Sequence, residues 1–261
     1  MKAERASSSD LESLPPAYAA WRARRLGQVT DALEQDLILK LIGPPAGLRI
    51  LDVGCGDGVL VVELAGPAAH VTGVDPSPEM IAAARRRAER QRREVSLELG
   101  KAEKLPFEAD TFDVVVAVTV LCFVEDTAGA LREMIRVLKP GGRLIVGELG
   151  KWSTWAAIRR IKAWLGSPVW RRARFRSAVE LRSLASGAGL VDVSVKGAVF
   201  YPPSGLAARM LGPIDHKIGA CTTLGAAFLA LAATKTCDVV AKVSRLGITR
   251  AELMRRTDDF L

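Results

Sequence analysis

The chain has 261 residues, of which 49% are hydrophobic and 25% are charged. This length suffices for one large domain with additions, and the composition excludes global disorder. No apolar run reaches the roughly 18 residues that a membrane-spanning helix needs, and the first residues lack the apolar core of a secretion signal. We therefore expect a cytoplasmic protein without an integral membrane segment.

The formal net charge of +8 comes largely from two segments. Six arginines lie between Arg85 and Arg93, where they favour the negative end of a predicted helix and are interpreted as a solvated helix end. The second segment, from Lys151 to Val179, holds eight basic residues, no acidic residue and four of the five tryptophans. A positive chain invites a nucleic-acid hypothesis, but no RNA-binding module or aromatic–basic motif of that class is present.

The first half of the chain alternates strands with helices. Residues 17–42 have the spacing of an N-terminal helix, and residues 48–53 and 70–74 are strands that flank a glycine loop and a helix. Ser77 and Pro78 begin another helix, which is followed by a short strand at 95–99. Residues 112–120 form an apolar, β-branched run typical of a central strand. Asp126 caps the next helix, which ends at Pro140-Gly141-Gly142 before a strand at 143–148.

The second half adds insertions to this pattern. A capping box at Ser177–Glu180 starts a helix, and residues 191–200 and 225–234 are predicted strands. The interval 201–224 is too long for a hairpin loop and is interpreted as an insertion over the site. We predict an N-terminal helical cap (1–45), a core (46–150), a basic Trp-rich lid (151–176), the rest of the core (177–237) and a helical tail (238–261). Such alternation specifies an α/β, doubly wound, mostly parallel sheet.

A glycine loop between the first strand and its helix is the first functional signal. Gly54, Gly56 and Gly58 in LDVGCGDG allow unusual dihedral angles and a close approach of backbone to a ligand. The spacing is GxGxG rather than the GxGxxG of dinucleotide-binding folds, which weakens an NAD hypothesis. Asp75 ends the next strand, where a carboxylate can accept from both hydroxyls of a ribose. Loop and acid together indicate an adenosine cofactor.

These motifs resemble those of the class I S-adenosylmethionine (SAM)-dependent methyltransferases, in the UbiE-like small-molecule group. LDVGCGDG is similar to the glycine motif of that group, GVDPSPEM to its ribose-binding acid, KAEKLPFEADTFDVVVAV to its adenine-side loop and fourth strand, and REMIRVLKPGGRLIVGEL to its fifth-strand unit. The resemblance covers residues 48–148 strongly and the rest weakly. It implies a Rossmann-like, seven-stranded sheet with an N-terminal helical addition and lid insertions.

The resemblance also implies a set of cofactor-binding residues for SAM and its product S-adenosylhomocysteine. The residues that it places around the cofactor are Asp52, Gly54, Cys55, Gly56, Asp75, Pro76, Met80, Ala102, Glu103, Val118, Thr119 and Phe123. Lys101 departs from the aspartate usual in the group and cannot accept a hydrogen bond from adenine, so Glu103 or a backbone oxygen must serve. The opening Tyr18–Gly27, with Glu34 downstream, resembles a YDxW…G…E motif, which implies that Tyr18 and Trp21 cover the cofactor, although Ala19 replaces its aspartate.

Methyl transfer is an in-line displacement that depends on positioning, and a hydroxyl or ammonium acceptor also needs a base. His216 is the candidate base, with a surface or packing role as the alternative; His70 is interpreted as structural. The stripe Trp152, Trp155, Ile158, Ile161 and Leu165 is read either as a lid helix packed on the core, as a functional lid or as a membrane-surface helix.

We therefore expect a SAM-dependent methyltransferase that acts on a small, partly apolar or anionic metabolite. An RNA-directed methyltransferase and a SAM-binding protein without catalysis are the alternatives. No metal site is expected, and the four cysteines are interpreted as buried or semi-buried thiols. Cys122 as an arsenite ligand is a minor alternative.

Overall fold

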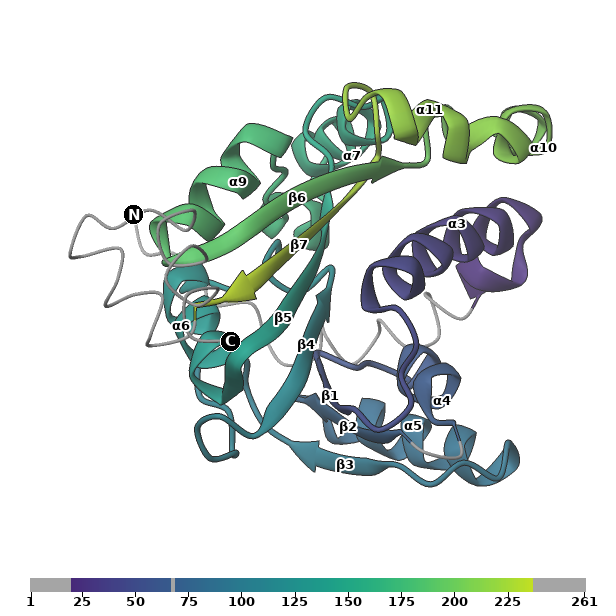
Figure 1. Ribbon diagram of the computed structural model, residues 1–261. Helices are drawn as coiled ribbons and strands as arrows, with labels where there is room; N and C mark the ends of the chain where they lie inside the picture. Colours follow the sequence, from purple (N-terminus) through teal and green to yellow (C-terminus); the bar gives the residue numbers. More distant parts are fainter. Residues whose placement is uncertain (1–19, 67–68, 237–261) are drawn as a thin grey trace, which may run out of the picture.

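A computed structural model describes residues 20–66 and 69–236, and its centre is a seven-stranded sheet (Figure 1). The strand order is β3-β2-β1-β4-β5-β7-β6. The strands are β1 (Arg49–Val53), β2 (His70–Asp75), β3 (Ser96–Leu99), β4 (Phe112–Val118), β5 (Leu138–Leu149), β6 (Leu190–Ala198) and β7 (Phe228–Lys235). Only β7 runs antiparallel, between β5 and β6. The predicted doubly wound, mostly parallel, seven-stranded sheet is confirmed.

Helices cover both faces of the sheet and form two apolar cores. One core joins the sheet to α3 (Arg25–Ile42), α4 (Val59–Leu64) and α5 (Pro78–Arg90). The other joins it to α6 (Thr127–Val137) and α9 (Ala178–Gly187). β4 lies centrally and is almost wholly buried, as its apolar run predicts. The carboxyl ends of β1, β2, β4 and β5 consequently share one edge of the sheet, where ligands of such folds bind.

Local sequence signals explain most element boundaries. The side chains of Ser77 and Asp126 accept backbone hydrogen bonds at the starts of α5 and α6, and the capping box at Ser177 and Glu180 is formed. One boundary was predicted wrongly. Pro140-Gly141-Gly142 does not separate α6 from its strand, because β5 begins at Leu138, which pairs with Phe112 across a bulge.

The N-terminal helix is interrupted, contrary to the continuous helical spacing of residues 17–42. Arg24 has extended backbone angles and α3 starts at Arg25. A Cβ on Gly27 would collide with the Trp21 carbonyl, so glycine permits the tight passage between the two helical parts. Tyr18 and the tail 238–261 lie outside the described residues.

Two insertions leave the sheet at the edge that carries the strand ends. After β5, the chain forms α7 (Thr154–Trp164) and α8 (Pro168–Arg172). This excursion closes on itself, because Lys151 donates a backbone hydrogen bond to Arg176 at 2.8 Å and Arg176 donates to Leu149 at 3.0 Å. After β6, the chain forms α10 (Gly205–Leu211), the 3-10 helix η1 (Gly212–Ile214) and α11 (Asp215–Cys221). β6 is parallel to β5, so both insertions emerge at the same edge.

The apolar stripe predicted on α7 is only partly packed on the core. Trp155 is buried, whereas Trp152, Ile158, Ile161 and Leu165 are exposed. The reading of this stripe as one face packed on the core is therefore wrong.

The free cysteines also differ in part from expectation. Cys55 and Cys122 are buried as expected, but Cys221 is exposed; Cys237 lies outside the described residues. None of the helices within the described ranges is long and apolar enough to cross a bilayer.

Candidate functional site

The glycine loop turns sharply over the end of β2. Gly54 and Cys55 both donate backbone hydrogen bonds to the Val74 carbonyl, at 2.7 and 3.1 Å. Gly54, Gly56 and Gly58 all have positive φ, which glycine adopts without steric cost. A Cβ on Gly54 or Gly58 would strike a neighbouring side chain, whereas one on Gly56 would project into open space. The loop is therefore packed beneath and open above Gly56, as a ligand cradle requires.

Two acidic side chains stand at the carboxyl ends of β1 and β2. Asp75 accepts a hydrogen bond from the Gly56 backbone N–H at 3.0 Å and another from the Ser77 N–H at 2.9 Å. Asp52 is buried, and within the described residues no hydrogen bond or ion pair reaches its carboxyl. Burial, with a smaller effect of the Asp75 charge, raises the pKa of Asp52 to about 8. Burial also raises the pKa of Asp75.

The loop after β3 packs beside Asp75, on the side predicted for adenine. Gly100 donates a backbone hydrogen bond to the Asp75 carbonyl at 3.1 Å. A Cβ on Gly100 would collide with Pro106 and Val74. Ala102 is buried here, whereas Lys101 and Glu103 are exposed. Ala102 is therefore packed on the side predicted for adenine. A contact between adenine and the exposed Glu103 stays a prediction.

The end of β4 lies between the glycine loop and β5. Thr119 donates its backbone N–H to the Gly147 carbonyl at 2.7 Å and holds φ at 54°, a left-handed value unusual for a threonine. Residues held in such conformations cluster at ligand sites. Val118 and Thr119 are partly exposed at this edge, and Phe123 is exposed beyond it. Pro76 and Met80, at the start of α5, are also accessible.

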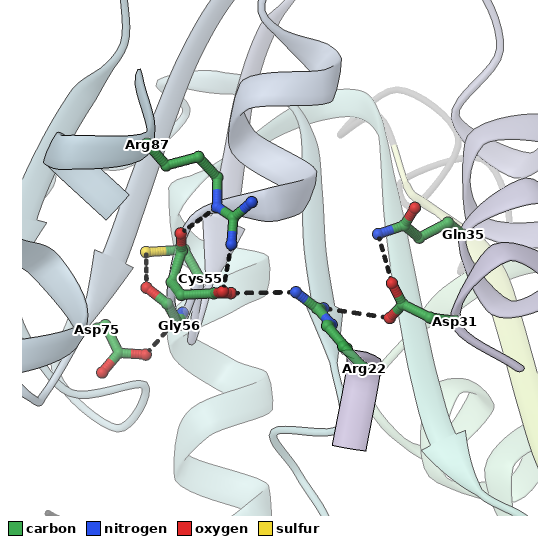
Figure 2. Close-up of polar contacts among 8 residues, drawn as sticks. Arg22, Asp31, Gln35, Cys55, Gly56, Asp75 and Arg87 are labelled. Carbon is green, nitrogen blue, oxygen red and sulfur yellow. Dashed lines mark hydrogen bonds and ion pairs between the residues drawn. The ribbon is translucent and has the colours of Figure 1, made fainter. Parts of the chain in front are cut away.

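An ion-pair network connects the N-terminal segment to the glycine loop (Figure 2). Asp57, within the loop, pairs with Arg22 at 3.2 Å and with Arg87 of α5 at 2.5 Å. Arg22 also pairs with Asp31 of α3 at 3.1 Å. Beside Arg22, Trp21 is partly buried against the core under α3. The residues around Trp21 are thereby positioned at the loop, which agrees with a covering role.

Sequence reasoning did not find this network. The sequence predicts Arg87 to be one of the solvated arginines at the end of its helix, but its Nε and a terminal nitrogen both bind Asp57. The available signal was the charged residue inside the glycine motif, which needs a partner if the loop is to be rigid.

Tyr201 joins three parts of the chain that cover the sheet edge. Its side chain is buried, and its hydroxyl lies 3.0 Å from the Thr30 hydroxyl on α3. Its carbonyl accepts a hydrogen bond from the indole N–H of Trp155 on α7 at 2.8 Å. Tyr201 itself begins the insertion after β6. The N-terminal helix and both insertions therefore meet at one buried tyrosine.

Glu34 and Arg159 lie in the same region, close enough for the charge of Arg159 to affect the pKa of Glu34. The guanidinium of Arg159 lies 5.2 Å from the ring centre of Trp155 and 4.8 Å from that of Trp170, an arrangement that attracts and orients a cation. Burial raises the pKa of Glu34 to about 8, although the nearby charge of Arg159 acts in the opposite direction. A carboxyl with such a pKa is suited to accept a proton near neutral pH.

A second buried acid lies at the end of β5 and carries its own counter-ion. Glu148 is fully buried and pairs with Arg176 at 2.6 Å. Arg176 closes the neck of the α7–α8 excursion and donates a further hydrogen bond to the Thr127 hydroxyl at 3.1 Å. Burial raises the pKa of Glu148 to about 7 even with Arg176 opposing it. Burial likewise raises the pKa of the adjacent Cys122, which keeps that thiol protonated.

The candidate base His216 is exposed on the first turn of α11. Its neighbour Asp215 is buried and accepts the backbone N–H groups of Val199 and Phe200, at 2.9 and 2.8 Å. Asp215 thus anchors α11 to the end of β6. A catalytic role of His216 stays a prediction.

The sheet order, the glycine loop and the acids at the ends of β1 and β2 define a class I, Rossmann-like methyltransferase. A methyltransferase domain family matches residues 51–146. The ubiquinone biosynthesis O-methyltransferase of Methylocella silvestris is 38% identical over 169 residues, which cover 62% of this chain and 65% of that protein. The protein of the same name from Azorhizobium caulinodans is 34% identical over 69% of this chain and 74% of its own length.

A solved structure agrees with these relatives. The SAM-dependent methyltransferase from Thermotoga maritima, described as a possible histamine N-methyltransferase, has a TM-score of 0.68 at 27% identity, covering 88% of this chain and 100% of that one. The chain belongs to the SAM-dependent methyltransferase family, in its UbiE-like small-molecule group, and SAM is its cofactor. The RNA-directed and non-catalytic alternatives are not favoured.

The site fits this cofactor on chemical grounds. SAM carries a sulfonium and an ammonium group, and Asp52 offers a buried carboxyl to which the described chain supplies no cation. The open space above Gly56 leaves room for the bound molecule. Across residues 20–66 and 69–236, no cluster of His, Cys, Asp or Glu side chains has the arrangement of a metal site.

Proposed function

We propose that the protein transfers a methyl group from SAM to a small, partly apolar or anionic acceptor by in-line displacement. The observation that carries the proposal is the junction at Tyr201, where α3, α7 and the insertion after β6 meet over the edge that holds the glycine loop. Such a cover excludes water and holds an acceptor in line, and positioning supplies much of the acceleration of such reactions.

The roles of the chain's own residues follow from their places. The Gly56 backbone, Asp52 and Asp75 would hold the cofactor, and Ala102, Val118 and Thr119 would border it. SAM supplies an electrophilic methyl group on its sulfonium, and the neutral thioether of S-adenosylhomocysteine is the leaving group. Arg159, fixed by two tryptophan rings, would meet an anionic group of the acceptor. The tryptophan rings around it would contact the apolar part of the acceptor.

A hydroxyl acceptor needs a base, and two residues compete for this role. His216 is the candidate from the sequence but is exposed. Glu34 is the candidate that burial supports, because its pKa of about 8 lets it hold a proton released near neutral pH. We favour Glu34. The names of the relatives, which refer to O-methylation and to possible histamine N-methylation, put hydroxyl and amine acceptors first in any screen.

Thermal shifts with SAM, S-adenosylhomocysteine and NAD, followed by turnover with a panel of aromatic hydroxyl and amine acceptors, test the proposal. We expect SAM and S-adenosylhomocysteine to stabilise the protein and NAD not to. We also expect methylation of at least one acceptor that carries both a hydroxyl and an acidic group. Stabilisation by NAD alone would refute SAM as the cofactor. Binding of SAM without turnover of any acceptor would refute catalysis.

Variants then separate the acceptor site from the cofactor site. Arg159→Ala should raise the acceptor KM on the order of tenfold or more, because a charge-assisted hydrogen bond to the acceptor is lost. The affinity for SAM should be nearly unchanged. Lys162→Ala is the matched control on the same helix. Glu34→Gln should lower kcat and remove its rise with pH, whereas His216→Asn should do so only if His216 is the base. Wild-type kinetics in Arg159→Ala and Glu34→Gln would leave both residues with packing roles only.

A further inference from the structure

The helix α7 exposes an apolar face that points away from the protein. Its buried residues are Trp155 and Ala156, which contact the body of the molecule. Four further apolar residues, at three- and four-residue steps, are solvent-exposed: Ile158 (40%), Ile161 (55%), Trp164 (85%) and Leu165 (71%). At about 100° per residue, Ile161 and Trp164 lie roughly 120° and 180° around the helix from Trp155, and Ile158 and Leu165 continue this exposed strip toward Trp155. We call this set the α7 face.

Basic side chains border the α7 face. Arg160 and Lys162, which flank Ile161 in the sequence, project to its two sides because each is about 100° from Ile161 around the helix. Arg171 and Arg172 follow on α8 and are exposed as well. No ion pair within the described residues neutralises any of these four cations. From residue 151 to 179 the chain has no acidic residue.

We propose that the α7 face docks on an anionic phospholipid membrane, with Ile161, Trp164 and Leu165 in the interface and the flanking cations on lipid phosphates. An interfacial helix has this arrangement: an apolar face, cations beside it and an exposed tryptophan. Each basic residue near an anionic bilayer adds attraction, and apolar side chains leave water at the same contact. Because no described helix can span a bilayer, the contact is peripheral.

Two other occupants fit the face less well. An RNA backbone would contact the cations but would leave exposed aliphatic residues such as Ile161 and Leu165 in water, since nucleic-acid sites use aromatic stacking and phosphate contacts. A second copy of this chain would bring the uncompensated cations of both copies together, and like charges at an interface are costly. An anionic bilayer satisfies both the apolar and the cationic side chains.

The position of α7 gives this contact a functional meaning. α7 follows β5 at the sheet edge that carries the cofactor residues, and Trp155 on its inner side binds the Tyr201 carbonyl of the cover. Docking through the outer side would hold that edge near the membrane, where apolar acceptors concentrate. The inference does not depend on the acceptor, because it rests on the outer face alone.

Vesicle flotation tests the proposal with the full chain. We expect binding to vesicles of phosphatidylglycerol and phosphatidylcholine in equal parts, weaker binding to pure phosphatidylcholine, and release as ionic strength rises. Ile161→Ser/Trp164→Ser should weaken binding on the order of tenfold or more. Arg160→Ala/Lys162→Ala should weaken it roughly twenty-fivefold, at about fivefold per charge. Brominated lipid should quench the fluorescence of the wild type more than that of the double apolar variant.

Matched variants distinguish this face from general stickiness. Val179→Ser/Val191→Ser removes two exposed apolar residues elsewhere, and Arg85→Ala/Arg86→Ala removes two exposed charges from α5. Both should bind vesicles like the wild type. The proposal is overturned if the folded wild type does not bind the anionic vesicles, or if the α7 variants bind as well as these controls. It is equally overturned if the α7 substitutions abolish dimerisation or poly(U) binding and leave vesicle binding intact. SAM-induced thermal shifts in every variant show separately whether the cofactor site is intact.

Discussion

Asp52 and Glu148 are two buried acids at the same edge of the sheet, and they differ in whether the chain supplies a counter-ion. Glu148, at the end of β5, has an arginine from the following excursion at 2.6 Å. Asp52, at the end of β1, has a second acid nearby and no cation from the described chain. A buried charge needs a partner. A counter-ion supplied by the chain therefore marks a structural acid, whereas a missing counter-ion marks the place of a cationic ligand.

The largest effect should follow from removing the structural counter-ion. Arg176→Met leaves Glu148 uncompensated, and we expect a loss of about 3–5 kcal/mol in the free energy of unfolding. Urea denaturation measures it. Lys151→Met is the control, because the exposed Lys151–Glu180 pair should contribute at most about 1 kcal/mol. The double variant Arg176→Met/Glu148→Leu should recover most of the stability. A loss in Arg176→Met no greater than in Lys151→Met would show that Glu148 does not need this counter-ion.

A smaller effect should follow at the ligand acids, and it should appear in binding. Asp75→Ala should weaken SAM binding by about 1–3 kcal/mol, the range for losing hydrogen bonds to a charged acceptor. Titration calorimetry on the folded variant measures this change, with Glu98→Ala, an exposed acid on β3, as the control. Unchanged affinity in Asp75→Ala would remove this residue from the site. The protonation of Asp52 is the other property of these acids that should affect SAM affinity.

The pH dependence of stability should have a definite sign. The pKa of Asp52 is raised from 3.8 to about 8 in the folded protein, so the folded state holds a proton that the unfolded state has lost. Its contribution to stability is therefore complete below the unfolded value and is lost as the pH rises through about 8. Glu34, with a pKa of about 8, and Glu148, with one of about 7, act in the same direction. We expect the Tm of the ligand-free protein to fall between pH 6 and 9.

Cofactor affinity should change with pH in the opposite direction to stability. A cationic ligand favours ionised Asp52, so SAM affinity should rise between pH 6 and 8, by at most tenfold per unit for one proton. Calorimetry in buffers of different ionisation enthalpy should detect release of up to one proton at pH 6.5. Asp52→Asn should flatten the pH dependence. If proton release persists in this variant, another group is responsible.

Local features of the sequence were sufficient for the sheet and for most of the cofactor site. Gly54 and Gly56 need positive φ, Ser77 and Asp126 cap helices, and the apolar run of β4 suits only a strand buried on both faces. Each of these constraints acts within a few residues. Their order along the chain, together with the family resemblance, was enough to place Asp75 beside the loop, because parallel strands end at one edge.

Contacts between residues from distant parts of the chain depend on the tertiary structure. The same basic, helical description applied to α5 and to α7, yet Arg87 of α5 turns inward to Asp57 of the glycine loop while Ile161 and Leu165 of α7 turn outward. Periodicity shows that a helix has two faces, but the chain around it determines which face is covered. For the same reason, the pairing of Arg176 with Glu148 and the raised pKa of Glu34 could not be read from spacing: burial and counter-ions depend on elements that meet only in the fold.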